Sequence, residues 1–194
     1  MKKRIIYREE YMNKLKAYKD KQIIKVITGI RRSGKSTILN EFKKELIDEG
    51  ILEKNIISIN FEDNSNRELL DFQKLHDYII EKTDKECMNY IFLDEIQNVT
   101  EFQKCIDSLL LRDYLDIYIT GSNSYMLSGE LATYLTGRYI QIHVLPLSFK
   151  EYISYYGKED ELKKYNEYSM YGGFPYLINL ENSNEKLDYL DSIY

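Results

Sequence analysis

The residues that most constrain this chain are the nine that read GIRRSGKST (29–37), which follow directly on the apolar run IIKVITG (23–29). Two glycines separated by four residues and followed by Lys-Ser match the pattern G-x-x-x-x-G-K-[ST] in full. The short, β-branched run before it is typical of a buried parallel strand. From Ser36 to Glu49 the apolar residues fall on one helical face, and Gly50 suits the end of that helix. The sequence therefore predicts a strand, a glycine loop and a helix, in that order.

A loop of this composition builds an anion site at the positive end of the following helix, because its backbone N–H groups point into one concavity. We expect Lys35 to bridge the β- and γ-phosphates of a nucleotide and Ser36 to offer its hydroxyl to Mg²⁺. The residues expected to hold the nucleotide are Gly29, Ile30, Arg31, Arg32, Ser33, Gly34, Lys35, Ser36 and Thr37.

A pair of carboxylates is predicted to complete the site, at the end of the run YIFLDE (90–95). We expect Asp94 to hold Mg²⁺ directly or through its water, and Glu95 to polarise a water for in-line attack on the γ-phosphorus. An acidic pair at a strand end can also be only a turn or a helix cap, but the glycine loop favours the catalytic interpretation. Kinases of small metabolites need no such glutamate, so the pair favours hydrolysis.

The base of the nucleotide is expected to be adenine. Nowhere does the chain contain an Asn-Lys-x-Asp motif, the pattern that reads guanine, so ATP is the preferred nucleotide.

Two further polar positions are candidates for contacts with the nucleotide. The run ITGSNS (119–124) ends a predicted strand, and Ser122 is the first choice to sense the γ-phosphate, with Thr120 and Asn123 as alternatives. An ordinary Ser/Asn helix cap is the competing interpretation. In LTGRY, Arg138 is a cation that could reach a nucleotide bound to an adjacent subunit, and a surface salt bridge is its alternative.

The remaining apolar runs complete an α/β pattern. Predicted strands at 23–29, 55–61, 89–95, 116–122 and 139–145 alternate with helical segments near 36–49, 69–80 and 102–110. This alternation predicts a parallel sheet covered by helices on both faces. After Pro146 the pattern is helical only, which predicts a small helical annex.

Composition narrows the class of protein. The chain has 194 residues, of which 43% are hydrophobic and 30% charged, which is typical of a globular domain. No apolar run approaches the roughly 20 residues that cross a bilayer, and the start lacks the apolar segment of a secretory signal. Cys87 and Cys105 are isolated, and the two histidines are too scattered for a zinc site. We therefore expect no membrane attachment and a cytoplasmic location.

The net charge of −5 is unevenly distributed. Residues 1–25 hold nine Lys/Arg against three Asp/Glu, a charge of +6, so the rest of the chain carries −11. A solvated amphipathic helix explains this arm, and contact with nucleic acid or a neighbouring subunit is the alternative.

Arg31 and Arg32 add more positive charge than a phosphate loop needs, because the loop already has Lys35. We expect at least one of them to reach an acidic partner such as Glu62 or Asp63, or to lie across a subunit contact, with plain exposure as the alternative.

With these motifs in place, the chain resembles the AAA+-type predicted ATPases of bacteria and archaea in which a P-loop domain precedes a C-terminal domain of unknown function. The resemblance rests on GIRRSGKST, FLDEIQ, ITGSNS, LTGR, LPLSFKEY and GGFP. It implies a P-loop NTPase fold of the ASCE class, a three-layer sandwich with strand order 5-1-4-3-2. It also implies Mg²⁺-dependent ATP hydrolysis that uses Lys35, Asp94 and Glu95, and a lid that begins near Pro146.

The expected organisation is an N-terminal helical arm at 1–22, an ATPase core at 23–146 and a helical lid at 147–194. Relatives in the family continue well past this length, so we expect the chain to correspond to their N-terminal half, with an incomplete lid. The leading hypothesis is an ATPase whose hydrolysis drives or times a conformational change, with a homo-oligomer as one form of assembly. The alternative is a nucleotide-responsive module that binds nucleic acid or protein and has little turnover of its own.

Overall fold

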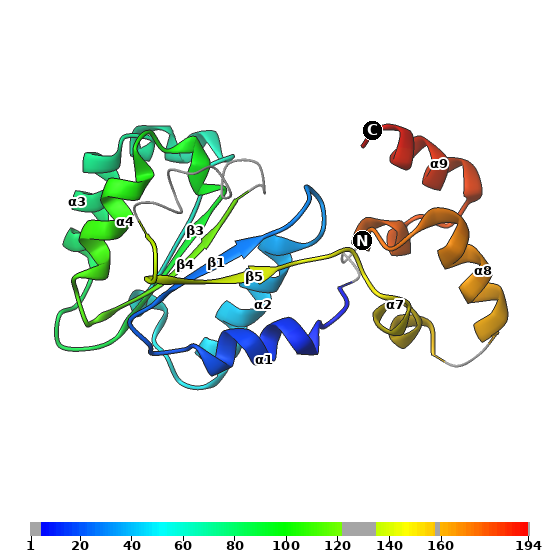
Figure 1. Ribbon diagram of the computed structural model, residues 1–194, viewed down its shortest axis with the longest axis horizontal. Coiled ribbons are helices and arrows are strands. Elements are labelled where there is room, and N and C mark those ends of the chain that lie inside the picture. The colour runs from blue at the N-terminus through cyan, green and yellow to red at the C-terminus, as the bar shows by residue number, and fades with distance from the viewer. Residues whose placement is uncertain (1–4, 122–134, 158–159, 194) are drawn as a thin grey trace.

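In the described part of the chain, five parallel strands form one sheet (Figure 1). The structure is a computed structural model and describes residues 5–121, 135–157 and 160–193. The sheet order is β2-β3-β4-β1-β5, which confirms the expected order 5-1-4-3-2. The strands are β1 (Ile24–Thr28), β2 (Ile56–Asn60), β3 (Asn89–Asp94), β4 (Leu115–Thr120) and β5 (Tyr139–His143).

Helices cover both faces of the sheet, so the core has three layers, as expected. One face packs against α1 (Glu9–Ala17) and α2 (Lys35–Asp48), and the other against α3 (Phe72–Lys82) and α4 (Phe102–Leu110) (Figure 1). Alternation along each strand produces this arrangement, because successive side chains point to opposite faces. In β3, for example, Phe92 belongs to the core under α2 and its neighbour Leu93 to the core under α3 and α4.

Local capping sets the start of α3, where the prediction was wrong by three residues. The apolar spacing predicted a helix from Leu69, but the Asp71 side chain accepts hydrogen bonds from the backbone N–H groups of Gln73 and Lys74, so α3 begins at Phe72. Leu69 instead ends the 3-10 helix η2 (Asn64–Leu69). Three more short 3-10 helices are η1 (Glu53–Asn55), η3 (Ile96–Asn98) and η4 (Pro175–Asn179).

The residues after β5 are helical in the described part of the chain, as expected. They form α7 (Phe149–Tyr156), α8 (Glu161–Tyr171) and α9 (Ser183–Asp191), which lie together beyond the carboxyl ends of the strands (Figure 1). We call α7 to α9 the helical lid. Among the helices that the structure describes, none has the length and apolar character needed to cross a membrane.

Gly173 fixes the lid to the end of the sheet. The N–H of Leu147 donates to the carbonyl of Gly173 at 2.7 Å. A Cβ at position 173 would lie 2.1 Å from the Leu147 carbonyl oxygen, so only glycine allows the two backbones to approach this closely. Gly173 therefore has a packing role at this junction.

A buried ion pair joins β1 and β4 near their starts, at the opposite end from the glycine loop. Lys25 donates to the carboxylate of Asp116, and both side chains are at most 1% exposed. The hydroxyl of Tyr118 and the backbone N–H of Asp20 also donate to Asp116, at 2.8 and 2.9 Å. These bonds satisfy the carboxylate and offset much of the cost of burying two charges.

Asp116→Ala should therefore lower the free energy of unfolding by about 3–5 kcal/mol, because it leaves the Lys25 ammonium buried without its charge partner. Replacing both residues by apolar ones of similar size should recover most of that loss. Urea unfolding followed by circular dichroism measures both variants. A cost below about 1 kcal/mol for Asp116→Ala would contradict this account of the pair.

Candidate functional site

The glycine loop begins where β1 and β5 run closest together. The N–H of Val144 donates to the carbonyl of Thr28 at 2.7 Å. Gly29 has φ of +147°, and a Cβ on it would lie 2.2 Å from the Val144 carbonyl oxygen. The next tight position is Gly34, with φ of +100°, directly before α2. These two positions require glycine, as the motif predicted.

Lys35 is the first residue of α2, and its side chain turns back under the loop. The ammonium donates to the carbonyl oxygens of Gly29 at 3.2 Å and Ile30 at 3.3 Å. It also lies 3.8 Å from Oε1 of Glu95, with 4% of its side chain exposed. The loop therefore places its lysine between its own backbone and the carboxylate that ends the third strand.

Thr120 connects the two acidic residues at the end of β3. Its hydroxyl donates to Oδ1 of Asp94 and accepts a 2.9 Å hydrogen bond from the backbone N–H of Glu95. Glu95 has φ of +56° and ψ of +48°, a left-handed conformation that is uncommon for a residue with a side chain. Thr120 is fully buried, so it orients the acidic pair from the adjacent strand.

Gln97, which was not among the expected site residues, holds the carboxylate of Glu95. Its amide Nε2 donates to Oε2 of Glu95 at 2.6 Å, while Oε1 of Glu95 faces the ammonium of Lys35. One carboxylate oxygen is thus anchored and the other faces the loop. Gln97 was visible in FLDEIQ, two residues after Glu95. No sequence pattern, however, distinguishes a glutamine that holds a carboxylate in a short turn from an ordinary surface glutamine.

A cavity of about 750 Å³ opens over the loop. Of the expected residues, Arg31, Arg32, Gly34, Lys35, Ser36, Thr37 and Glu95 line it. Gly29 and Ile30 support it through their bonds to Lys35, and Asp94 is not among its lining residues in the described chain. The Ser36 hydroxyl at the cavity and the Asp94 carboxylate beside Glu95 are oxygen donors, which suit Mg²⁺.

Apolar side chains also line this cavity. Ile5, Met12 and Ile38 come from the N-terminal segment, α1 and α2, and Leu147 and Ile178 from the residues after β5. A cavity lined by both a phosphate loop and apolar side chains suits the two parts of a nucleotide.

The other predicted site residues are Ser122 and Arg138. Ser122 and its alternative Asn123 lie outside the described residues, so their assignment stays a prediction. Arg138 directly precedes β5, at the end of the sheet opposite to the loop, and its guanidinium forms an ion pair with Asp107 of α4. The surface salt bridge is thus present. The contact with another subunit's nucleotide stays a prediction, and this position does not favour a contact within the same chain.

The two arginines in the middle of the loop point to different parts of the molecule. Arg31 is 82% exposed and lies 3.3 Å from the carboxylate of Glu62, which confirms the expected acidic partner. The guanidinium of Arg32 lies 5.1 Å from the ring centre of Tyr189 in α9, and it donates to Ser192 at 3.4 Å. The two arginines therefore connect the loop to both the core and the lid.

Most described cations of the N-terminal arm have acidic partners within the chain. Lys14 pairs with Glu10, Lys16 with Glu45 and Lys19 with Glu49. Lys25 and Arg8 are buried. The helix itself, α1, spans only Glu9–Ala17. Much of the excess charge at this end is consequently neutralised by the fold, which weakens the interpretation as a free basic surface.

A parallel sheet in this order, with a phosphate loop after its first strand and an acidic pair on a neighbouring strand, defines a P-loop NTPase of the AAA+ type. Residues 21–153 match the family model described as an AAA domain. The match covers more than half of the 194 residues, so the chain belongs to this family.

Two curated relatives extend over most of the chain. An uncharacterised protein of Haemophilus influenzae is 42% identical over 183 residues, covering 92% of this chain and 46% of that protein. An uncharacterised protein of Methanocaldococcus jannaschii is 35% identical over 188 residues, covering 88% of this chain and 41% of that protein. The chain thus spans less than half the length of these relatives.

Solved structures show the same fold at low identity. The Walker-type ATPase of Pyrococcus abyssi has a TM-score of 0.57 at 18% identity, covering 88% of this chain and 65% of that one. PCH-2 of C. elegans has a TM-score of 0.54 at 20% identity, covering 77% of this chain and 47% of that one. One structure of Hsp104 from S. cerevisiae has a TM-score of 0.55 at 14% identity, covering 86% of this chain and 30% of that one.

Arg31→Ala should leave the affinity for Mg-ATP within about twofold of the wild type, since an exposed ion pair such as Arg31–Glu62 contributes only about 0–1 kcal/mol. Glu62→Ala is the matched control and should behave in the same way. Titration calorimetry with a non-hydrolysable ATP analogue measures both. A loss above tenfold for Arg31→Ala alone would show that its guanidinium contacts the nucleotide instead.

Proposed function

We propose that this chain binds ATP with Mg²⁺ and hydrolyses its terminal phosphate. The observation that carries the proposal is the meeting of Lys35 and Glu95 at one cavity, with Nζ and Oε1 3.8 Å apart. A cation that holds the γ-phosphate and a carboxylate that receives a proton from the attacking water act on the same phosphoryl group, so the two side chains must meet at one cavity.

Each residue of the site then has a chemical role. The backbone N–H groups of the loop hold the phosphates, and the Lys35 ammonium releases its two carbonyl partners to neutralise charge on the terminal phosphate. Oε1 of Glu95 takes the proton from water. Gln97 holds Oε2, and Thr120 holds the backbone N–H of Glu95. Bound Mg²⁺, held by Ser36 and Asp94, would neutralise charge on the phosphate oxygens.

The apolar side chains of the cavity lining favour a nucleoside over a simple phosphate compound as the ligand. Ile5, Met12 and Ile178 are lining residues against which a flat purine ring can pack. The absence of an Asn-Lys-x-Asp motif from the sequence makes adenine the proposed base.

The proposed use of hydrolysis is to drive or time a change in the position of the lid, which contacts the loop through Arg32. In this proposal residues 1–22, 23–146 and 147–194 act as an arm, an ATPase core and a lid. The proposal also includes a protein or nucleic-acid client, assembly into a homo-oligomer and a cytoplasmic location. The relatives are longer than this chain, and the proposal does not extend to the function of their additional residues. A binding module with little turnover is the rival, and its nucleic-acid form is weakened by the paired cations of the arm.

Lys35→Ala and Glu95→Gln should separate binding from hydrolysis. Lys35→Ala should weaken Mg-ATP binding by roughly 100-fold or more, since removing one partner of a buried charge contact costs about 2–5 kcal/mol. Glu95→Gln keeps the shape of the side chain and should bind ATP normally while turnover falls by about 100- to 10,000-fold. Binding is measured by calorimetry and turnover by phosphate release.

Wild-type protein that binds ATP but shows no phosphate release above the Glu95→Gln variant would support the rival binding module. Normal turnover by Glu95→Gln would remove Glu95 as the base. The exposed Glu101→Gln variant, in the loop after η3, is the control for the loss of one surface carboxylate.

We further propose that Arg138 acts on the nucleotide of an adjacent subunit, since it lies at the end of the sheet away from its own loop. The turnover per molecule should then rise with protein concentration, and Arg138→Ala should lower it by about 1,000-fold or more. Asp107→Ala, which frees Arg138 from its ion pair, is the control and should retain activity. A rate per molecule that is constant with concentration and unaffected by Arg138→Ala would argue against shared catalysis.

A further inference from the structure

Arg8, directly before α1, is a buried arginine that lines the cavity and has no role in the reaction proposed above. Its side chain is 5% exposed and makes a two-point contact with Glu151 of α7, Nε to Oε1 at 2.8 Å and Nη2 to Oε2 at 3.0 Å. Its other bonds go to main-chain carbonyls, to Leu145 at 2.8 Å and Pro146 at 3.4 Å before the lid, and to Ser33 of the loop at 3.3 Å. One guanidinium thus joins the loop, the segment after β5 and the first helix of the lid.

The bond to Ser33 determines the direction of a phosphate-binding group. The carbonyl of Ser33 and the N–H of Gly34 belong to one planar trans peptide, so they point in opposite directions. Because the carbonyl is turned toward Arg8, the N–H of Gly34 is turned away from it. Gly34 lines the cavity. The Ser33 side chain is buried and lies close to Gly29, which leaves little room for the peptide to rotate once Arg8 holds it.

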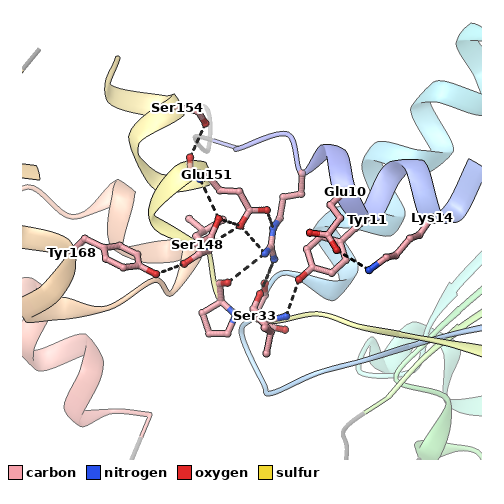
Figure 2. A network of polar contacts seen from close by, with 12 residues as sticks. Glu10, Tyr11, Lys14, Ser33, Ser148, Glu151, Ser154 and Tyr168 are labelled. Carbon is pink, nitrogen blue, oxygen red and sulfur yellow. Dashed lines mark hydrogen bonds and ion pairs between the residues drawn. The ribbon is translucent and has the colours of Figure 1, made fainter. Parts of the chain in front are cut away.

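The bond to Glu151 connects that peptide to the lid. Glu151 also completes the capping box of α7, since its Oε2 accepts from the backbone N–H and the hydroxyl of Ser148 at 2.8 and 2.9 Å. Figure 2 shows Glu151 and Ser148 on one side of this network and Ser33 on the other. Burial alone would raise the pKa of Glu151, but the bonds from Arg8 and Ser148 outweigh it and lower that pKa. The carboxylate is therefore charged at neutral pH and holds Arg8 firmly.

We infer that Arg8 is a positioning residue for the phosphate site: through Ser33 it orients the N–H of Gly34, and through Glu151 it ties that orientation to the lid. The inference rests on the proposed function, since it concerns how the same loop holds the phosphates of ATP. It also gives the N-terminal segment a role in nucleotide binding that its exposed charges do not have. A lid displaced from the core would release Arg8 and with it the orientation of the peptide.

Titration calorimetry of the whole chain with Mg²⁺ and a non-hydrolysable ATP analogue tests the inference. Arg8→Met, which keeps the stem and removes the charge, should weaken binding about tenfold, in the range of a typical coupling between two sites. Glu151→Gln should also weaken binding of the analogue. The double variant should bind no worse than Arg8→Met alone, because both residues act through one path.

The matched control is Lys25→Met, which breaks the buried Lys25–Asp116 ion pair at the far end of the sheet. It should lower the unfolding temperature as Arg8→Met does but leave the affinity unchanged, so a general loss of stability is separated from positioning. Arg8→Lys serves if Arg8→Met does not fold; one ammonium cannot reach the carboxylate and the loop carbonyl together, so binding should again weaken several-fold.

The outcomes are distinct. Affinity equal to the wild type in the folded Arg8 variants would reduce Arg8 to a structural residue and overturn the inference, while the proposed function stands. If the wild type binds the analogue no better than Lys35→Ala, the proposed function fails and the inference fails with it. Weakened binding by the Arg8 variants, with Lys25→Met unchanged, supports the inference.

Discussion

The site depends on how closely β1 and β5 run together at their carboxyl ends. The hydrogen bond from Val144 to Thr28 brings the two backbones together, and a Cβ at position 29 would lie 2.2 Å from the Val144 carbonyl oxygen. The chain must therefore turn at Gly29, away from the sheet and into the loop. Because the turn is this tight, Lys35 returns beneath its own loop and reaches the Gly29 carbonyl at 3.2 Å. The start of α2 and the floor of the cavity follow from that one approach.

Sequence patterns predicted the features that depend on residues close together in the chain. The alternation of apolar runs located every strand to within about two residues, and the glycine spacing located the loop. The exact helix starts needed side-chain detail: Asp71 caps α3, so the apolar residues just before it could not join the helix. The strand order came from the resemblance to a known family, because the spacing of strands says which are present but not which are neighbours.

Contacts between distant residues were not predictable in the same way. Arg8 and Glu151 are 143 positions apart, and in the sequence Arg8 is only one of nine cations in a basic arm. Gln97 lies beside Glu95 in the chain, but its role depends on the turn of η3 and on the left-handed backbone of Glu95. Such contacts depend on where the fold brings side chains together, and no local period records them. Ser122, predicted from the end of a strand, remains a prediction outside the described residues.

The excess charge in the loop is explained by the direction in which each cation points. Lys35 turns inward, whereas Arg31 reaches Glu62 at the end of β2 and Arg32 reaches Tyr189 in α9. Arg8 holds the same loop through the carbonyl of Ser33. Four cations therefore fix one short loop to its own backbone, to the core, to the lid and to the N-terminal segment. A loop that had only to bind phosphate would need the first of these alone, since backbone N–H groups supply the rest. The other three connect the loop to the core, to the lid and to the N-terminal segment, as the proposed coupling of nucleotide binding to movement of the lid requires.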